Sequence, residues 1–119
     1  MGEVVKVCAR TPWVDTGVAV QQGQVLTLRA SGSWTDWFIS CGPEGYERSY
    51  LKPVSCLRRV RDAPWFCLIG AIDKDLATAF RIGVGVTLPA PRAGRLFAFA
   101  NDAPFAYGNN RGCIDLTID

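Results

Sequence analysis

The sequence predicts an all-β fold, an antiparallel β-sandwich with a jelly-roll-like arrangement. Leu26, Leu28 and Ala30 alternate with polar residues, and this two-residue period is typical of a strand with one buried face. The same period recurs over 80–87 and over 114–119, whereas no stretch shows a sustained helical repeat. The 119 residues have room for about six to eight such strands in a single domain that spans residues 1–119.

Further short apolar runs, each bounded by turn residues, predict strands over 4–9, 67–72 and 96–100. Short helical turns are expected over 54–60 and 74–78. Four aromatic residues lie within strand-like patterns and are expected in the core: Trp13, Trp34, Phe97 and Phe99. Because the strands of a sandwich form a rigid frame, a binding site is expected on its loops.

Composition excludes several classes of function. The 13 Lys and Arg residues nearly balance the 11 Asp and Glu residues, and the chain contains no His. Without imidazole there is no Ser-His-Asp or Cys-His nucleophile and no His-based catalytic zinc. The net charge of +2 is too small to indicate a nucleic-acid partner. The one dense basic cluster, Arg58, Arg59 and Arg61, is expected to be a solvated loop rather than a phosphate-binding patch.

The sequence shows no membrane or secretion signal. No apolar run approaches the ~18 residues of a membrane span, and the N-terminus lacks the basic-then-apolar pattern of a signal peptide. We therefore expect a soluble chain made in the cytoplasm, whose release would follow a non-classical route.

The cysteines are odd in number and irregular in spacing, without a C-x-x-C motif: Cys8, Cys41, Cys56, Cys67 and Cys113. This pattern indicates neither a zinc knuckle nor a disulfide framework. Buried free thiols, compatible with a reducing compartment, are expected.

The most informative loop, 101–112, reads N-D-A-P-F-A-Y-G-N-N-R-G. It carries three oxygen-bearing side chains, Asp102, Asn109 and Asn110, and turn residues between them leave backbone carbonyls free. Carboxylate, amide and carbonyl oxygens are the ligands that Ca²⁺ prefers, so a calcium site is one interpretation. The other is a plain turn in which Asp102 accepts a hydrogen bond from a neighbouring backbone N–H, and spacing alone favours the turn.

The same loop resembles the calcium- and galactose-binding loop of the PA-I galactophilic lectin (LecA-like) family. Further similarity to this family follows in order along the chain, in the W-V-D-T-G opening of 13–34, the G-P-E-G turn at 42–45 and the apolar strand at 68–72. The resemblance implies a galactose-binding-domain-like β-sandwich that acts as a calcium-dependent lectin. Ca²⁺ would bridge the protein to two vicinal hydroxyls of a galactose.

The resemblance also implies a set of metal ligands. Three side chains and two backbone carbonyls would hold the ion: Asp102, Asn109 and Asn110 through their side chains, and Ala106 and Asp36 through their carbonyls. The loop after Trp34 is one residue shorter than in the family, so Trp37 is the alternative to Asp36.

The implied sugar contacts depart from the family in two places. Asp102 and Asn109 would hydrogen-bond the sugar hydroxyls, and Ala103 would line the pocket. Ser49 and Lys52 stand where the family has a sugar-contacting His and a Gln. A short hydroxyl and a mobile cation at these positions predict retained calcium binding with an altered sugar preference.

Three functions of different classes follow. The first is a calcium-dependent lectin for galactose-containing glycans or related sugars, in which weak single sites favour an even-numbered homo-oligomer, a dimer or a tetramer. The second is a sandwich that has lost sugar binding and serves as a structural or protein-interaction domain. The third, an enzyme using cysteine chemistry, is disfavoured because no imidazole is available to activate a thiol.

Five loop aromatics flank the predicted site and could stack on a pyranose: Trp37, Phe38, Tyr46, Phe105 and Tyr107. Of these, Tyr107 is expected to pack beneath its own loop.

Overall fold

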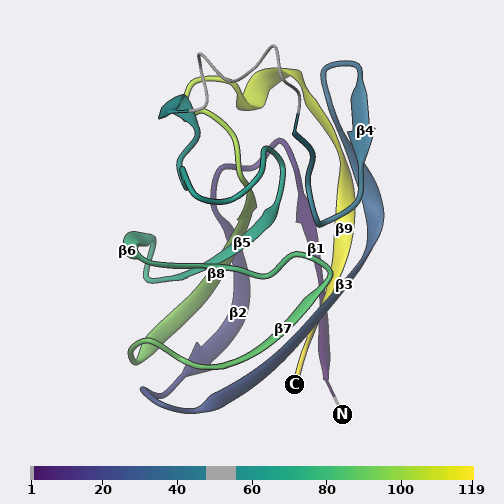
Figure 1. Ribbon diagram of the computed structural model, residues 1–119. Coiled ribbons are helices and arrows are strands. Elements are labelled where there is room, and N and C mark those ends of the chain that lie inside the picture. Colours follow the sequence, from purple (N-terminus) through teal and green to yellow (C-terminus); the bar gives the residue numbers. More distant parts are fainter. Residues whose placement is uncertain (1, 48–55) are drawn as a thin grey trace.

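Two antiparallel β-sheets pack face to face in the computed structural model, which describes residues 2–47 and 56–119 (Figure 1). The predicted all-β sandwich is confirmed. The described residues form nine strands: β1 (Glu3–Cys8), β2 (Val14–Val20), β3 (Val25–Asp36), β4 (Ile39–Cys41), β5 (Leu68–Ile72), β6 (Asp75–Arg81), β7 (Gly85–Pro89), β8 (Gly94–Ala100) and β9 (Asn110–Ile118). A short 3-10 turn, η2 (Tyr107–Asn109), precedes β9. None of the described residues belongs to a helix long and apolar enough to cross a membrane.

The long strand β3 organises the first sheet. It pairs with β9 along one edge, and its other edge is shared by β7 at the start of the strand and β4 at its end. Strand β1 continues the sheet beyond β9, which gives the order β1-β9-β3-β4 with β7 beside β3. The second sheet has the order β2-β8-β5-β6. Figure 1 shows the β4 hairpin and η2 at one end of the sandwich and both chain termini at the other.

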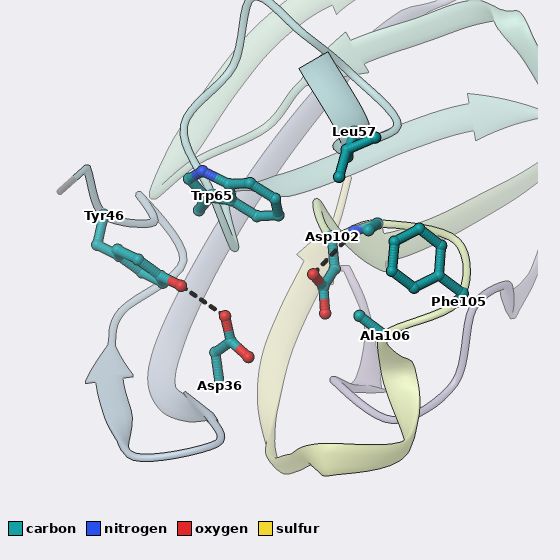
Figure 2. A pocket seen from close by; sticks show the side chains of 8 residues that line it. Asp36, Tyr46, Leu57, Trp65, Asp102, Phe105 and Ala106 are labelled. Carbon is teal, nitrogen blue, oxygen red and sulfur yellow. Dashed lines mark hydrogen bonds between the residues drawn. The ribbon is translucent and has the colours of Figure 1, made fainter. Parts of the chain in front are cut away.

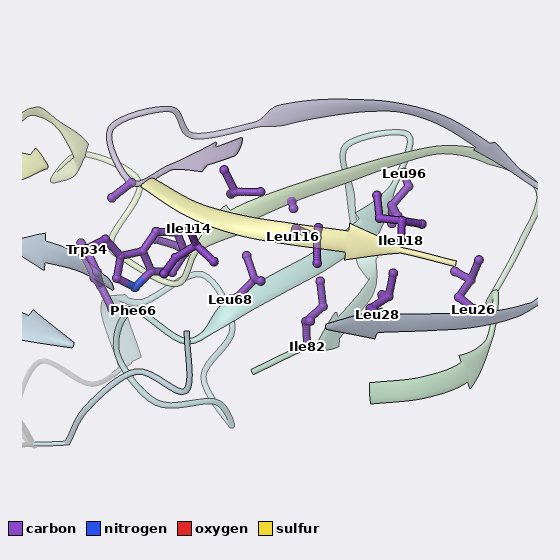
Figure 3. Close-up of a cluster of buried hydrophobic side chains, with 14 of the residues drawn as sticks. Leu26, Leu28, Trp34, Phe66, Leu68, Ile82, Leu96, Ile114, Leu116 and Ile118 are labelled. Carbon is purple, nitrogen blue, oxygen red and sulfur yellow. The ribbon is translucent and has the colours of Figure 1, made fainter. Parts of the chain in front are cut away.

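Period-two alternation turns the apolar residues of the two sheets toward each other. The large side chains buried between them come mostly from β3, β5, β8 and β9 (Figure 3): Leu26, Leu28, Trp34, Leu68, Leu96, Ile114, Leu116 and Ile118. Each buried side chain of this kind stabilises the fold by about 1.5–3 kcal/mol. The core therefore forms a rigid base for the loops at its ends.

The prediction of one strand over 80–87 is wrong. The chain leaves the second sheet after β6, turns at Gly83 with a φ of 58°, and enters the first sheet as β7. Ile82 is buried before the turn, whereas Val84 is 58% exposed after it. The apolar alternation continues through a crossing between sheets, so periodicity alone could not separate the two strands.

Of the two predicted helical turns, one is absent and the other is present in part. Residues 74–78 form no helical turn, because Lys74 completes a tight turn and the rest of the segment is strand β6. In 54–60, a 3-10 conformation is present at Cys56 and Leu57 and bends follow to residue 60, while 54 and 55 lie outside the described residues.

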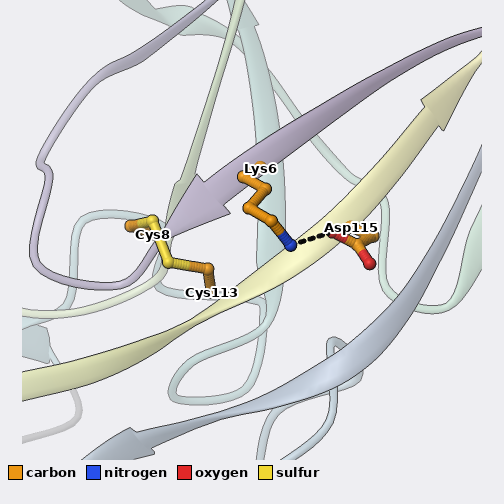
Figure 4. Close-up of a disulfide and its surroundings, with 4 residues drawn as sticks. All are labelled: Lys6, Cys8, Cys113 and Asp115. Carbon is orange, nitrogen blue, oxygen red and sulfur yellow. Dashed lines mark hydrogen bonds and ion pairs between the residues drawn. A yellow bond between two sulfur atoms is a disulfide. The ribbon is translucent and has the colours of Figure 1, made fainter.

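A disulfide joins Cys8 of β1 to Cys113 of β9 (Figure 4). The two residues are direct partners in the antiparallel register, with their Cα atoms 3.9 Å apart. The prediction of free thiols is therefore wrong for this pair, because a sequence separation of 105 residues hides a pairing that the sheet creates. Of the three cysteines outside this disulfide, Cys67 is buried as expected, but Cys41 is half-buried and Cys56 is exposed.

The prediction of a solvated arginine loop holds for Arg61 alone. The Arg58 guanidinium donates to the carbonyl of Arg61 at 2.7 Å. The Arg59 guanidinium lies over the rings of Trp13 and Phe99, 4.3 and 3.7 Å from their centroids. Such cation–π contacts hold the loop before β5 against β8, so these two cations serve packing rather than an open surface.

The predicted core aromatics occupy the expected places. Trp34, Phe97 and Phe99 are buried. Trp13 is half-buried and meets Phe99 edge to face, with 5.0 Å between ring centroids.

Candidate functional site

At one end of β3 and of β9, the residue that faces the core is polar rather than apolar. Asp36 continues the inward parity of Leu26, Leu28 and Trp34, and Asn110 continues that of Ile114. Asp36 and Asn110 are also direct partners in the antiparallel register of the two strands. Their side chains therefore lie at the end of the core, opposite the chain termini.

Asp102 and Asn110 form the most buried part of this polar cluster. Asp102 follows β8 and is 2% exposed. Its Oδ1 accepts the backbone N–H of Ala103 at 2.8 Å, as the plain-turn interpretation requires, and its Oδ2 accepts Asn110 Nδ2 at 3.1 Å. Asn110 Nδ2 also donates to the Ala9 carbonyl at 3.0 Å.

The amide oxygen of Asn110 is left without a partner. Asn110 is fully buried, and its Oδ1 accepts no hydrogen bond from the described residues. A buried polar atom in this state costs about 1–3 kcal/mol. An oxygen of this kind beside a carboxylate is suited to a cation or a ligand hydroxyl.

Asp36 is held by a tyrosine. Tyr46 donates its hydroxyl to Asp36 Oδ2 at 2.5 Å (Figure 2). The backbone of Tyr46 is fixed by an antiparallel bridge to Trp65, with its N–H 2.7 Å from the Trp65 carbonyl. The carboxylate of Asp36 is thereby positioned by a buried ring rather than by a mobile side chain.

A pocket of about 240 Å³ opens over Asp36 and Asp102 (Figure 2). Its lining residues are Asp36, Tyr46, Leu57, Trp65, Asp102, Ala103, Phe105 and Ala106. Apart from the two carboxylates and the tyrosine hydroxyl, these side chains are mostly apolar. The pocket thus combines hard oxygen donors with walls that suit the C–H faces of a small ligand.

Burial disfavours the ionised form of both carboxyl groups. Burial raises the pKa of Asp102 to about 6; the hydrogen bond from Asn110 opposes this shift, and the charge of Asp36 adds to it. Burial also raises the pKa of Asp36, against the hydrogen bond from Tyr46. Among residues 2–47 and 56–119, neither carboxylate forms an ion pair with Lys or Arg. The site therefore concentrates negative charge that the described cations do not neutralise.

The chain places most of the predicted site residues around this pocket. Asp36, Asp102, Ala103 and Ala106 line it, and Asn110 contacts Asp102 beneath it.

Asn109 lies in the adjoining η2 turn and is exposed. Its carbonyl accepts the N–H of Trp37 at 3.2 Å. The Trp37 carbonyl, the alternative to Asp36 as a ligand, accepts the Arg111 guanidinium at 3.2 Å. Ser49 and Lys52 lie outside the described residues.

Exposed aromatic side chains stand around the site. Trp37 and Phe38 are each 65% exposed and touch edge to face with ring centroids 4.6 Å apart, and Phe105 is 78% exposed. Tyr107 instead packs beneath its loop as expected, donating its hydroxyl to the Ala100 carbonyl at 2.6 Å. Tyr46 is buried and directed at Asp36, so it presents no open stacking face.

Sequence reasoning missed Asn101, which lies behind the pocket and holds one of its loops in place. Asn101 is fully buried, and its Oδ1 accepts the N–H of Val60 at 2.9 Å. Its Nδ2 donates to the carbonyls of Val60, Ala63 and Pro64. These bonds fix the loop that carries two lining residues also missed in the sequence, Leu57 and Trp65. No local pattern marks these contacts, because they join segments about forty residues apart.

The donor set decides which ions the site suits. The described residues gather no group of three or more His, Cys, Asp or Glu side chains at one point. The oxygens present are two carboxylates, one unpartnered amide oxygen and backbone carbonyls. Such a mixed set of hard donors fits Ca²⁺ rather than a metal that needs thiolate or imidazole.

Three of the five cysteines offer no thiolate nucleophile. Burial raises the pKa of Cys67, which keeps it protonated, and Cys8 and Cys113 are joined.

The fold is similar to that of solved structures, one of which is a lectin domain. No protein-family model and no curated protein matches the chain. Among solved structures, eight chains match. One of them is the N-terminal domain of EclA, described as a PllA-like lectin, which superposes with a TM-score of 0.71 and 22% sequence identity over 97% of this chain and 92% of that one. At this identity the likeness shows a common β-sandwich, over nearly the whole length of both chains.

Proposed function

We propose that this protein is a calcium-dependent carbohydrate-binding lectin without catalytic activity. The observation that carries the proposal is the buried Asp102–Asn110 pair, with an orphaned amide oxygen, facing Asp36 across an apolar-walled pocket. Two carboxylates without an ion pair to any described Lys or Arg, next to an amide oxygen that accepts no hydrogen bond from the described residues, are suited to a divalent cation. The lectin-type sandwich, with the pocket on its end loops, supports the same assignment.

The calcium ligands in this proposal are side-chain oxygens of Asp102, Asn109 and Asn110 together with the carbonyls of Asp36 and Ala106. The bound ion would supply free coordination places for two vicinal hydroxyls of a saccharide. Asn109 is exposed in the η2 turn directly before Asn110, so its side chain is open to solvent.

Galactose or a related galactoside is the proposed ligand. Asp102 and Asn109 would hydrogen-bond its hydroxyls, and Ala103 and Phe105 would face its C–H surfaces. Ser49 and Lys52 would set the preference among related sugars. Since a monosaccharide buries little apolar surface, single-site affinity is expected to be weak, and a dimeric or tetrameric assembly would add avidity.

The test is binding to immobilised galactose and to a glycan array, in calcium buffer and in chelator. We expect retention with calcium and release on chelation. Asp102→Asn should lose calcium and sugar binding together, because it removes a buried ligand charge. Asn is used rather than Ala since it keeps an acceptor for the Ala103 N–H. Sugar binding that survives chelation would contradict the proposal.

The exposed aromatics favour one second candidate, a protein-interaction domain built on the same sandwich. Trp37 and Phe38, which follow Asp36 in the chain, and the pocket-lining Phe105 present exposed apolar surface, as interaction surfaces do. The two candidates separate in the same experiment, because an interaction domain would ignore both calcium and galactosides.

A further inference from the structure

The carboxylate of Asp36 lies at the pocket (Figure 2). One of its oxygens accepts the Tyr46 hydroxyl, and no described residue hydrogen-bonds the other. Figure 2 shows this carboxylate and that of Asp102 on facing sides of the same space. Two carboxylates that sense each other's charge favour a proton or a cation between them.

A second observation points to a cation. Asn110 is fully buried, contacts Asp102 and carries the unpartnered Oδ1. A proton shared by the carboxylates would leave this oxygen unsatisfied, whereas a cation can be coordinated by all three groups. Asp36 and Asn110 are register partners at the strand ends, so their side chains arise from neighbouring backbone positions.

We infer that the Asp36 carboxylate is itself a calcium ligand, and that Tyr46 is the positioning residue that holds it toward the ion. The inference rests on the proposed calcium site and adds to it a second protein charge. With two carboxylates the ion is neutralised within its protein ligands. Because the number of charged ligands sets calcium affinity, this site should bind Ca²⁺ more tightly than one with a single carboxylate.

Tyr46 is suited to that positioning role by its own fixation. Its N–H is bound to the Trp65 carbonyl at 2.7 Å, and its ring packs near Phe66 with 6.3 Å between centroids. A hydroxyl donating to a carboxylate makes a charge-assisted hydrogen bond, which orients the acceptor. Partners of this kind behind a metal ligand contribute about 10- to 100-fold to metal affinity.

The experiment is calorimetric titration of calcium chloride into the chelator-stripped chain with its disulfide intact. Asp36→Asn should weaken calcium binding by about a hundredfold. Tyr46→Phe should weaken it by about tenfold. Glu44→Gln is the matched control, since it removes an exposed carboxylate outside the pocket, and it should change affinity by less than about twofold.

A melting curve in chelator gives a second readout. Asp36→Asn keeps an acceptor for Tyr46 and removes charge repulsion, so it should melt at or above the wild type without calcium and below it with saturating calcium. A purely structural Asp36 would lower both melting temperatures.

The outcomes separate the inference from the proposed function. Wild-type calcium affinity in Asp36→Asn overturns the inference, while a loss in Asp102→Asn upholds the calcium site. If Asp36→Asn keeps calcium and loses only sugar binding, Asp36 is a sugar contact and the inference also fails. Absence of calcium binding in the wild type overturns both.

Discussion

Asp102 is a carboxyl group whose ionisation is opposed by burial. It is 2% exposed, accepts two hydrogen bonds and faces a second carboxylate, yet no described cation forms an ion pair with it. Because burial raises its pKa from 3.8 to about 6, the metal-free folded chain holds a proton here between these pH values, whereas the unfolded chain releases it. Protons and calcium therefore compete for the same oxygens.

This competition predicts opposite pH profiles with and without metal. The folded-state pKa of Asp102 is raised from 3.8 to about 6, so its contribution to stability is fully present below 3.8 and is lost as the pH rises through about 6. In chelator, Asp102 should therefore lower the melting temperature over this interval. The stabilisation by calcium should grow over the same interval, because the proton no longer occupies the site.

Thermal melts across this pH range, with chelator and with calcium, check the prediction. Asp102→Asn serves as the control, since it cannot titrate and should flatten the difference between the two curves. Calcium stabilisation that is equal at pH values below 3.8 and above 6 would contradict it.

The β3–β4 hairpin is the element in which local strain lies closest to the site. Asp36 and Ile39 close a two-residue turn in which Trp37 has a φ of 56°. A two-residue hairpin turn of this kind normally has glycine at its first central position. The strained turn presents Trp37 and Phe38 beside the site, while the Trp37 backbone bonds Asn109 and Arg111.

Glycine substitutions at the two turn residues, Trp37 and Phe38, measure the backbone strain at Trp37. Trp37 and Phe38 are equally exposed, and both variants lose the same ring contact, but Trp37 alone has a positive φ. In chelator, Trp37→Gly should therefore be more stable than Phe38→Gly by about 1–2 kcal/mol. Urea unfolding measures the difference, and equal stabilities would show that the turn carries no strain.

At the same scale, the sequence predicts strands well where one face is buried. The alternation around Leu28 and Leu116 locates β3 and β9 because each packs one face on the core. It fails over 80–87, where the chain changes sheets without breaking the apolar pattern. Periodicity reports which residues are buried, and carries no information on which sheet buries them.

The sequence likewise predicts only part of the candidate site. The loop 101–112 is visible in the sequence because its oxygen-bearing residues are close together along the chain. The Asp36 carboxylate, Tyr46 and Asn101 are not, since their roles depend on contacts between segments distant in sequence. The same limit applies to the arginine loop. Its sequence predicts a solvated Arg59, because the packing of Arg59 on Trp13 and Phe99 depends on residues distant along the chain.

Across the whole molecule, the site depends on a link between the two ends of the chain. The Cys8–Cys113 disulfide joins β1 to β9, and β1 pairs with no other strand among the described residues. The next residue along, Ala9, donates its N–H to the Gly112 carbonyl and accepts Asn110 Nδ2. The bridge therefore holds the edge strand and the backbone that orients Asn110.

Opening this disulfide should reduce stability and calcium affinity together. Cross-links of this separation stabilise a fold by about 2–5 kcal/mol, because they restrict the unfolded chain. Reduction, or the Cys8→Ser/Cys113→Ser double variant, should lower the free energy of unfolding in urea by that amount. Calcium affinity at a temperature where the variant remains folded should also fall, since Asn110 loses a fixed acceptor.

Cys56→Ser is the control, because it removes an exposed free thiol and should leave both quantities unchanged. A reduced protein that is less stable but binds calcium normally would show that Asn110 is held by its strand alone. An unchanged free energy of unfolding would show that the β1–β9 ladder needs no covalent link. Because the thiol–disulfide state depends on the compartment, the expected joint loss of stability and calcium affinity would make the calcium site more robust in oxidising surroundings than in reducing ones.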